Sequence, residues 1–374
     1  MTELILIGDA LEKLKEIEDK TVDCCVTSPP YWGLRDYQTA KWEGGDIGCD
    51  HVANTRATKK FGNDVFNENR PSREETKTKG YYADVCPKCG AIKKDLQIGL
   101  EGTPEAYINR LVAVFREVKR VLKDDATLWV NIGDSYANQK SGDTYSGFND
   151  RYFGKETDGG KQAQTVSNAH IGKLDFQDCK PKDLVGIPWM LAFALRFDGW
   201  YLRQDLIWAK PNPMPESVRD RCTKSHEYIF LLSKSPSYYY DACAIKEPVK
   251  NMGKPRAFSK PGNNDRNDVG RIYEPRETRN KRSVWFISTK PYKGAHFATF
   301  PPDLIEPCIL AGSREGGIVL DPFMGSGVTC MVAKKHGRGY IGVDLNPSYT
   351  ELAKKRIYEG TKDGLQLTMS GLAV

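Results

Sequence analysis

Apolar residues occur along the chain in short continuous runs that alternate with stretches of helical spacing. The short runs lie at residues 4–7, 22–26, 127–132, 201–208, 228–232, 318–320 and 340–343. Thr103 and Pro104 supply an N-cap and a first turn, and apolar residues from Leu111 to Leu122 then share one helical face. This alternation predicts an α/β fold with a doubly wound, mostly parallel sheet.

Three polar stretches interrupt the alternation, at residues 38–100, 138–180 and 246–290. The last contains 12 Lys or Arg against 5 Asp or Glu, an excess larger than the net charge of +6 of the 374-residue chain. A basic run of this kind is either a solvated loop or a contact to nucleic-acid phosphates. We expect the second, through four cations: Arg276, Arg279, Lys281 and Arg282.

A glycine turn stands between an apolar run and a helical stretch in residues 319–329. Gly325 and Gly327 allow a sharp turn and a close approach of a ligand. The next apolar run ends at Asp344, where a carboxylate can accept hydrogen bonds from ribose hydroxyls. The turn lacks the full dinucleotide pattern and opens with residues 321–323, Asp-Pro-Phe, which favours a smaller adenosine ligand over NAD.

The run at 22–26 leads into Thr27-Ser28-Pro29-Pro30-Tyr31. Two prolines make a rigid extended turn, which can hold the Ser28 hydroxyl and the Pro29 carbonyl as paired acceptors. Such a pair can bind both hydrogens of an exocyclic amino group and direct its lone pair at an electrophilic methyl group. Tyr31 offers a face on which a flipped-out base can stack. A proline-rich strand exit packed by aromatic residues is the structural alternative.

The Ser-Pro-Pro-Tyr motif precedes the glycine turn in the chain. In this order of motifs the chain resembles the β-type DNA amino-methyltransferases, whose catalytic tetrapeptide precedes the cofactor loop. Further matching segments are 6–11, 224–231 and 296–301. The resemblance implies a Rossmann-like methyltransferase fold with permuted motif order, S-adenosylmethionine as cofactor and double-stranded DNA as partner. It implies catalysis by Ser28, Pro29, Pro30 and Tyr31. The cofactor contacts that it implies are Asp9, Ala10, His296, Thr299, Asp321, Pro322, Phe323, Gly325, Ser326, Gly327 and Asp344.

The resemblance also divides the chain. It implies a catalytic half at 1–37 and 101–245, and a cofactor-binding half at 291–374. The polar stretch at 38–100 is an insertion between these parts, and the basic stretch at 246–290 departs most from the shared pattern, so we expect the target-recognition region there. In the resembling enzymes a Ser in the first tetrapeptide position is usual for cytosine-N4 methylation, and Asp or Asn for adenine-N6 methylation. Ser28 therefore favours cytosine N4, and adenine N6 stays open.

The insertion carries a Cys-x-x-Cys-Gly motif at Cys86 and Cys89, with Cys49 and His51 upstream. Three thiolates and one imidazole are the ligands of a closed tetrahedral zinc site, so we expect a zinc knuckle. A chance cysteine pair in a loop is the alternative. Ten cysteines in 374 residues are too sparse for a disulfide scaffold, and we expect the cysteines outside this cluster to be packing residues.

Two other functions compete with methylation: a nucleotide-dependent oxidoreductase, and a nucleic-acid binder built on an inactive methyltransferase fold. The first does not explain the Ser-Pro-Pro-Tyr turn, and the second does not explain why both motifs are complete. No run of apolar residues is long enough for a membrane span, and no export signal is evident, so we expect a cytoplasmic protein. A homodimer and a cognate restriction enzyme stay open.

Overall fold

The computed structural model describes residues 2–35, 37, 39–51, 85–137, 175–176, 178–249, 256–257, 272–273, 277–290 and 300–370. The chain divides into two compact units. One contains residues Met1–Asp36 and Ile98–Val374, and the other contains Tyr37–Gln97.

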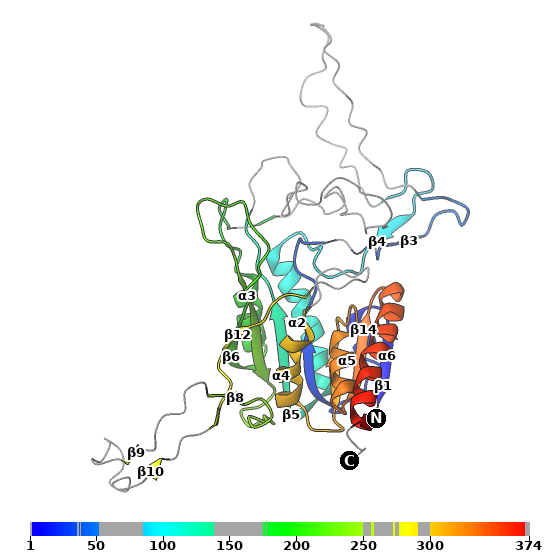
Figure 1. The fold of residues 1–374 in the computed structure, drawn as a ribbon. Coiled ribbons are helices and arrows are strands. Elements are labelled where there is room, and N and C mark those ends of the chain that lie inside the picture. The colour runs from blue at the N-terminus through cyan, green and yellow to red at the C-terminus, as the bar shows by residue number, and fades with distance from the viewer. Residues whose placement is uncertain are drawn as a thin grey trace, which may run out of the picture. The chain divides into compact units, whose positions relative to one another are not determined.

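The larger unit is built on a sheet with the strand order β1-β14-β13-β2-β5-β7-β6-β12 (Figure 1). Neighbouring strands are parallel except at β5·β7 and β6·β7, so β7 alone runs against the others. The strands are β1 (Glu3–Ile7), β2 (Val22–Thr27), β5 (Leu122–Ile132), β6 (Tyr201–Ala209), β7 (His226–Ser233), β12 (Val284–Phe286), β13 (Ile318–Asp321) and β14 (Gly339–Asp344).

Helices cover both faces of this sheet. They are α1 (Ala10–Leu14), α2 (Pro104–Val121), α3 (Ile187–Phe197), α4 (Pro302–Gly312), α5 (Val328–Lys335) and α6 (Pro347–Ser370). The first three pack into one apolar core and the last three into another, and Figure 1 shows α4, α5 and α6 together on one face. A mostly parallel sheet with helices on both faces is the doubly wound fold that the sequence predicts, and the prediction is confirmed.

The start of α2 is also as predicted, because the Thr103 hydroxyl accepts a hydrogen bond from the Ala106 N–H at 3.1 Å. The end of this helix corrects the sequence interpretation, which placed Leu122 on the helical face. Leu122 is extended, with φ −70° and ψ 140°, and begins β5 opposite Val22. Its backbone pairing with β2 and its complete burial take precedence over the helical spacing.

In the residues that the structure describes, three two-stranded pairs lie outside the main sheet: β3 (Lys41–Glu43) with β4 (Ile92–Lys94), β8 (Glu247–Pro248) with β11 (Thr278–Arg279), and β9 (Arg256–Ala257) with β10 (Ile272–Tyr273). Among the helices in the described ranges, none combines the length and the apolar character that a bilayer crossing requires.

Candidate active site

The Ser-Pro-Pro-Tyr turn leaves the sheet directly after β2, whose last residue is Thr27. β2 lies beside β13, and the helices that follow these two strands in the chain, α2 and α5, pack on opposite faces. In a doubly wound sheet such a point opens a crevice at the carboxyl ends of the strands, where ligands bind. The fold therefore places the expected catalytic turn beside the expected cofactor loop.

The turn is anchored to the rest of the core on both sides of Tyr31. The Tyr107 hydroxyl of α2 donates a hydrogen bond to the Pro30 carbonyl at 2.8 Å. Trp32 is 2% exposed, and its indole N–H donates to the Glu101 carbonyl at 2.7 Å. Because the Pro30 carbonyl already has a donor inside the protein, Pro30 serves the shape of the turn.

Tyr31 points its hydroxyl into the protein, where it donates to Glu227 Oε2 at 2.8 Å. Its ring packs on Gly133: a Cβ at that position would lie 2.6 Å from the ring Cε2. Burial raises the pKa of Tyr31 well above its ordinary value, and the negative charge of Glu227 adds to the rise, while a hydrogen bond with Ser28 opposes it. The phenol is therefore neutral and acts as a donor.

The glycine loop between β13 and α5 has the left-handed backbone that its glycines allow. Gly325 and Gly327 have φ of 50° and 74°, in the left-handed region. A Cβ on Gly327 would also lie 2.7 Å from the Ala353 Cβ of α6. The Met324 N–H donates to the Val343 carbonyl at 2.9 Å, which ties the loop to β14.

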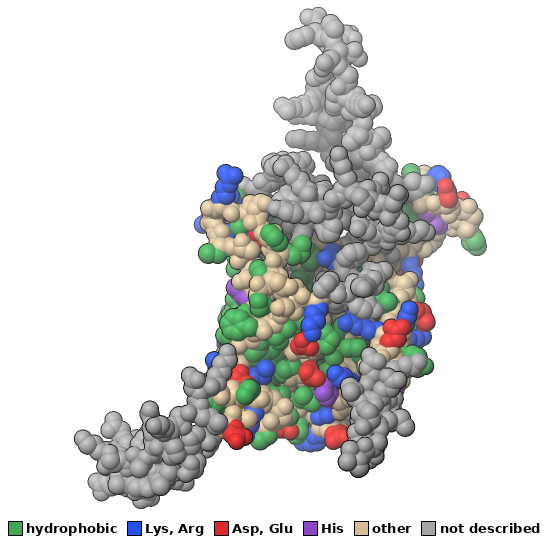
Figure 2. Space-filling view, viewed as in Figure 1, with side chains coloured by type: hydrophobic (Ala, Val, Ile, Leu, Met, Phe, Trp, Pro, Cys, Tyr) green, Lys and Arg blue, Asp and Glu red, His purple; other side chains and the backbone are tan. Residues whose placement is uncertain are grey.

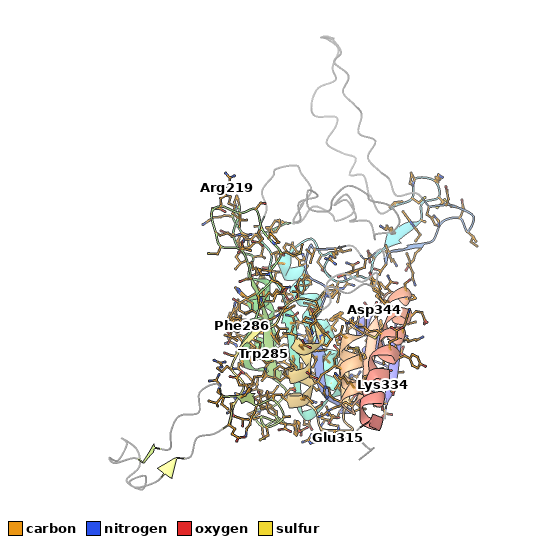
Figure 3. All side chains as sticks on the ribbon, in the orientation of Figure 1. Arg219, Trp285, Phe286, Glu315, Lys334 and Asp344 are labelled. Atoms are coloured by element: carbon orange, nitrogen blue, oxygen red, sulfur yellow. The ribbon has the colours of Figure 1, made fainter. Side chains whose placement is uncertain are left out.

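Asp344 ends β14 and faces this loop. Its carboxylate accepts hydrogen bonds from the Gly325 N–H at 2.9 Å and the Asn346 N–H at 2.8 Å. Burial raises its pKa to about 6. In Figure 3 Asp344 lies at the opposite end of the sheet from Glu315, which precedes β13, so Asp344 is at the carboxyl edge. The structure thus brings Asp344 and the glycine loop together, as expected.

Two further expected cofactor residues follow β1, which pairs with β14. Asp9 caps α1, where its Oδ1 accepts from the Glu12 N–H at 3.2 Å, and Ala10 is buried. Ser326 is 2% exposed, and its hydroxyl accepts from Arg356 of α6 at 2.6 Å. Asp9 therefore lies at the carboxyl edge, whereas the Ser326 side chain is turned into the protein.

Asp321 has a different environment from the one the sequence suggests. Its carboxylate is 1% exposed and accepts hydrogen bonds from the hydroxyls of Thr27 and Thr329, each at 2.6 Å, and from the Phe323 N–H at 3.0 Å. Burial raises its pKa to about 6. This carboxylate joins β2, β13 and α5 to one another. Pro322 and Phe323 begin the glycine loop beside it. A contact between Asp321 and the cofactor stays a prediction.

Three expected site residues lie outside the described residues. They are His296 and Thr299, expected at the cofactor, and Arg276, expected at DNA.

Comparison with known proteins assigns the family. The sequence matches the DNA methylase family of N6 and N4 methyltransferases over residues 22–355. It is 42% identical over 353 residues to the type II methyltransferase M.SmaI of Serratia marcescens, which covers 94% of this chain and 90% of that one. It is 40% identical over 350 residues to M.Cfr9I of Citrobacter freundii, which covers 94% and 86%. The chain belongs to this family of DNA methylases.

A solved structure with the same fold is the cytosine-N4-specific PvuII DNA methyltransferase, with a TM-score of 0.52 and 14% identity over 98% of this chain and 93% of that one. Membership confirms the family that the motif order resembles, and the protein is a DNA amino-methyltransferase. The oxidoreductase alternative is thereby excluded.

The smaller unit of this DNA methylase brings the four expected metal ligands together. One ligand atom from each of Cys49, His51, Cys86 and Cys89 lies within 4.8 Å of the others. The sulfur atoms of Cys49 and Cys86 are 3.9 Å apart, close to the ~3.8 Å edge of a tetrahedron with zinc–sulfur bonds of about 2.3 Å. The donor set and its spacing therefore fit zinc.

Two glycines shape this cluster, and sequence reasoning noticed only one. Gly90 has a φ of 74°, and its N–H donates to the Cys86 carbonyl at 2.8 Å, which closes the knuckle turn. Gly45 was not predicted: a Cβ there would lie 2.6 Å from the Cys89 sulfur. The only signal in the sequence is the pair Gly44-Gly45 a few residues before Cys49.

In the expected target-recognition region, the described cations are partly engaged with the protein itself. Arg279 and Arg282 both donate to Glu247 Oε1, at 2.7 and 2.6 Å. The Lys281 ammonium lies over the Trp285 ring, 5.0 Å from its centre. The two arginines thus share one carboxylate, so the group keeps a net positive charge.

The face of the sheet covered by α4, α5 and α6 has a different charge pattern. Figure 2 shows acidic and basic side chains mixed on this face, and several of them form pairs: Lys334–Glu3, His336–Glu306 and Lys354–Glu351. A surface of mixed sign attracts phosphate weakly. The described part of this face is therefore a poor candidate for DNA contact.

Sequence reasoning placed Thr27 in the catalytic motif and Glu227 in a family-matching segment, but it did not give the hydrogen bonds by which they hold the site, and it did not single out Tyr107. Thr27, Glu227 and Tyr107 each bond to a group of the catalytic turn or the cofactor loop. Their only signal is a polar residue beside an otherwise apolar run, as in Glu227 before Tyr228 and Ile229. A polar residue in a buried strand needs a partner, but the sequence does not name it.

Proposed function

We propose that this DNA methylase transfers a methyl group from S-adenosylmethionine to the N4 amino group of a flipped-out cytosine. The observation that carries the proposal is the position of Ser28 and Pro29 at the end of β2, beside the glycine loop that follows β13. Bound S-adenosylmethionine supplies the electrophilic methyl group. Ser28 and the Pro29 carbonyl accept the two amino hydrogens, which directs the nitrogen lone pair toward that methyl group.

The cofactor would lie across the carboxyl ends of β13, β14 and β1. Asp344 offers a carboxylate to the ribose hydroxyls, Gly325 and Gly327 allow close approach of the ligand, and Asp9 stands at the next strand end. The segment with His296 and Thr299 would contact the methionine end, as the family resemblance implies.

The choice of cytosine rests on Ser28 in the first position of the tetrapeptide. Cytosine N4 and adenine N6 both present an N–H₂ group beside a ring nitrogen, so hydrogen bonding to Ser28 alone does not exclude adenine. Mass spectrometry of nucleosides from DNA methylated by the purified enzyme decides between them. N4-methylcytosine is expected, and N6-methyladenine in its place would overturn the cytosine assignment.

The same assay tests the catalytic turn. Ser28→Ala removes one of the two acceptors and should reduce methyl transfer to either base by ~100-fold or more, in line with the loss of a preorganised polar group. Asp198→Asn is a control of similar burial outside the site, and it should keep wild-type activity. Wild-type activity in Ser28→Ala would remove Ser28 from the mechanism.

We also propose that Cys49, His51, Cys86 and Cys89 hold one structural zinc ion. The support is a donor set and spacing that fit a closed tetrahedral site. Elemental analysis of protein purified without chelators should give one zinc per chain, lost in Cys86→Ser/Cys89→Ser. Zinc content that is zero in the wild type, or unchanged in the double variant, would contradict the site.

The region at 246–290 is our candidate for target recognition on double-stranded DNA, supported by its charge excess. Replacing Arg276, Arg279, Lys281 and Arg282 by Ala should weaken DNA binding and reduce the slope of log affinity against log salt concentration, because fewer counterions are released. An unchanged slope would place the phosphate contacts elsewhere. The type II methyltransferases among the relatives favour a restriction–modification setting.

A further inference from the structure

A carboxylate and an ammonium group are buried together behind Tyr31, and no proposed step of the reaction uses them. Glu227 is the second residue of β7 and Lys210 directly follows β6; their side chains are 15% and 18% exposed. Lys210 donates to Glu227 Oε1, and its ammonium lies 4.3 Å from the centre of the Trp208 ring. The pairing of β6 with β7 brings them together, since it places Trp208 opposite Glu227.

The other oxygen of Glu227 is used as well. Oε2 accepts from the Tyr31 hydroxyl at 2.8 Å and from the Asn131 amide nitrogen at 3.2 Å. Asn131 lies in β5 and also donates to the Tyr228 carbonyl at 3.1 Å. All the described neighbours of this carboxylate are therefore donors, and they come from β5, from the end of β6 and from the catalytic turn.

The position of Tyr31 is thus determined at two points. Gly133 leaves room for the ring edge, where any Cβ would lie 2.6 Å from the ring, and Glu227 binds the hydroxyl. A tyrosine side chain has two rotatable bonds, so contacts at the edge and at the tip fix the direction of its face.

We propose that Glu227, neutralised by Lys210, is a positioning residue for methyl transfer, which orients the Tyr31 ring for the target base beside Ser28. The inference rests on the proposed function. A buried ion pair often contributes little to stability, because desolvation offsets the attraction between the charges. Here Glu227 of the pair instead binds the Tyr31 hydroxyl of the catalytic turn. A displacement of the face of the Tyr31 ring by about 1 Å is enough to slow a reaction strongly.

Glu227→Gln and Tyr31→Phe test the proposal from its two sides: the first disturbs the acceptor of the Tyr31 hydroxyl, and the second removes the hydroxyl, with its bond to Glu227 and its longer bond to Asn131 Oδ1 at 3.4 Å. In Glu227→Gln the amide N–H₂ must face one of the donors, since all the described neighbours of the carboxylate donate. Each variant should lower the single-turnover rate of methyl transfer by ~10- to 100-fold. The dissociation constants for S-adenosylhomocysteine and for target DNA should stay within about twofold of wild type.

The double variant Tyr31→Phe/Glu227→Gln should be no slower than the slower single variant, because Glu227 acts on the rate through the Tyr31 hydroxyl, which Tyr31→Phe already removes. Losses that multiply, or a wild-type rate in Glu227→Gln, would overturn the proposal. If Glu227→Gln fails to fold, the rate of Tyr31→Phe decides alone: a wild-type rate overturns the proposal, and a loss in rate with unchanged dissociation constants supports it.

Asp198→Asn is the matched control. Asp198 is 14% exposed, like Glu227, and pairs with Arg116 at 2.6 Å, but Arg116 is 65% exposed and the pair lies after α3, away from the catalytic turn. It should keep the wild-type rate. An equal loss in Asp198→Asn would show that removing the charge of any largely buried carboxylate lowers the rate, and would overturn the specific role of Glu227. Wild-type enzyme that methylates no DNA base would instead refute the proposed function itself.

Discussion

The ends of the neighbouring strands β13 and β14 both carry an aspartate, and the two carboxylates do different things. Burial raises the pKa of each to about 6. Asp321 accepts from two side-chain hydroxyls of the protein, on Thr27 and Thr329. Within the described part of the chain, the Asp344 carboxylate accepts only from backbone N–H groups of the glycine loop and of its own turn.

The difference lies in what surrounds each carboxylate. Asp321 is 1% exposed and connects the strand before Ser28 to the helix after the glycine loop through the hydroxyls of Thr27 and Thr329. Asp344 lies at the carboxyl edge beside the glycine loop, where we propose the ribose site. Asp321 is thus a structural link, because side chains of two elements donate to it. Asp344 is a candidate binding group, because its donors are backbone N–H groups of the glycine loop and of the turn after β14.

Of the changes that test this comparison, Asp321→Ala should have the largest effect, on the free energy of unfolding. It leaves the Thr27 and Thr329 hydroxyls buried without their acceptor, and should lower the free energy of unfolding by roughly 3 kcal/mol. Urea unfolding followed by circular dichroism measures the loss. Thr329→Val removes only one donor and should cost about 1 kcal/mol. Unchanged stability in Asp321→Ala, together with lost cofactor affinity, would make Asp321 a ligand contact like Asp344.

Asp344→Ala should show the opposite profile. It removes charge-assisted hydrogen bonds to the ribose and should weaken binding of S-adenosylhomocysteine by ~10- to 100-fold, which calorimetry measures. The unfolding free energy should change less than in Asp321→Ala, because the two N–H donors lie at the edge of the protein and can bind water. Equal affinities of Asp344→Ala and wild type would end the ribose assignment.

The smallest effect concerns pH, and its sign differs between binding and stability. Asp344 loses its proton as the pH rises through about 6, so affinity for S-adenosylhomocysteine should increase between pH 5 and 7, by up to about tenfold. The folded-state pKa of both acids lies above the ordinary value of 3.8. Their contribution to stability is therefore full below about pH 4 and is lost as the pH rises through about 6.

Asp344→Asn separates the two effects. It should make the affinity independent of pH over this range, while Asp321 still contributes its part of the pH dependence of stability. A pH dependence of binding that persists in Asp344→Asn would point to another titrating group.

Much of the fold was predictable because its signals are local. The short apolar run at 22–26, the Thr103-Pro104 cap and the glycine turn before Asp344 each depend on neighbours within a few residues, and each is present in the structure. The order of the motifs was enough to indicate the family. The Cys86–Cys89 spacing likewise indicated a metal site whose four ligand atoms the structure brings together.

The tertiary structure alone decided which polar groups meet. Thr27 and Asp321 are 294 positions apart in the chain, and Tyr31 and Glu227 are 196 apart, yet each pair shares a hydrogen bond. Leu122 likewise belongs to β5 and not to the helix that its spacing indicated, because its backbone pairs with Val22 of β2. Spacing along the chain reports periodicity and turns, which are local; a buried polar contact depends on strand order and register, which come from packing of the whole sheet.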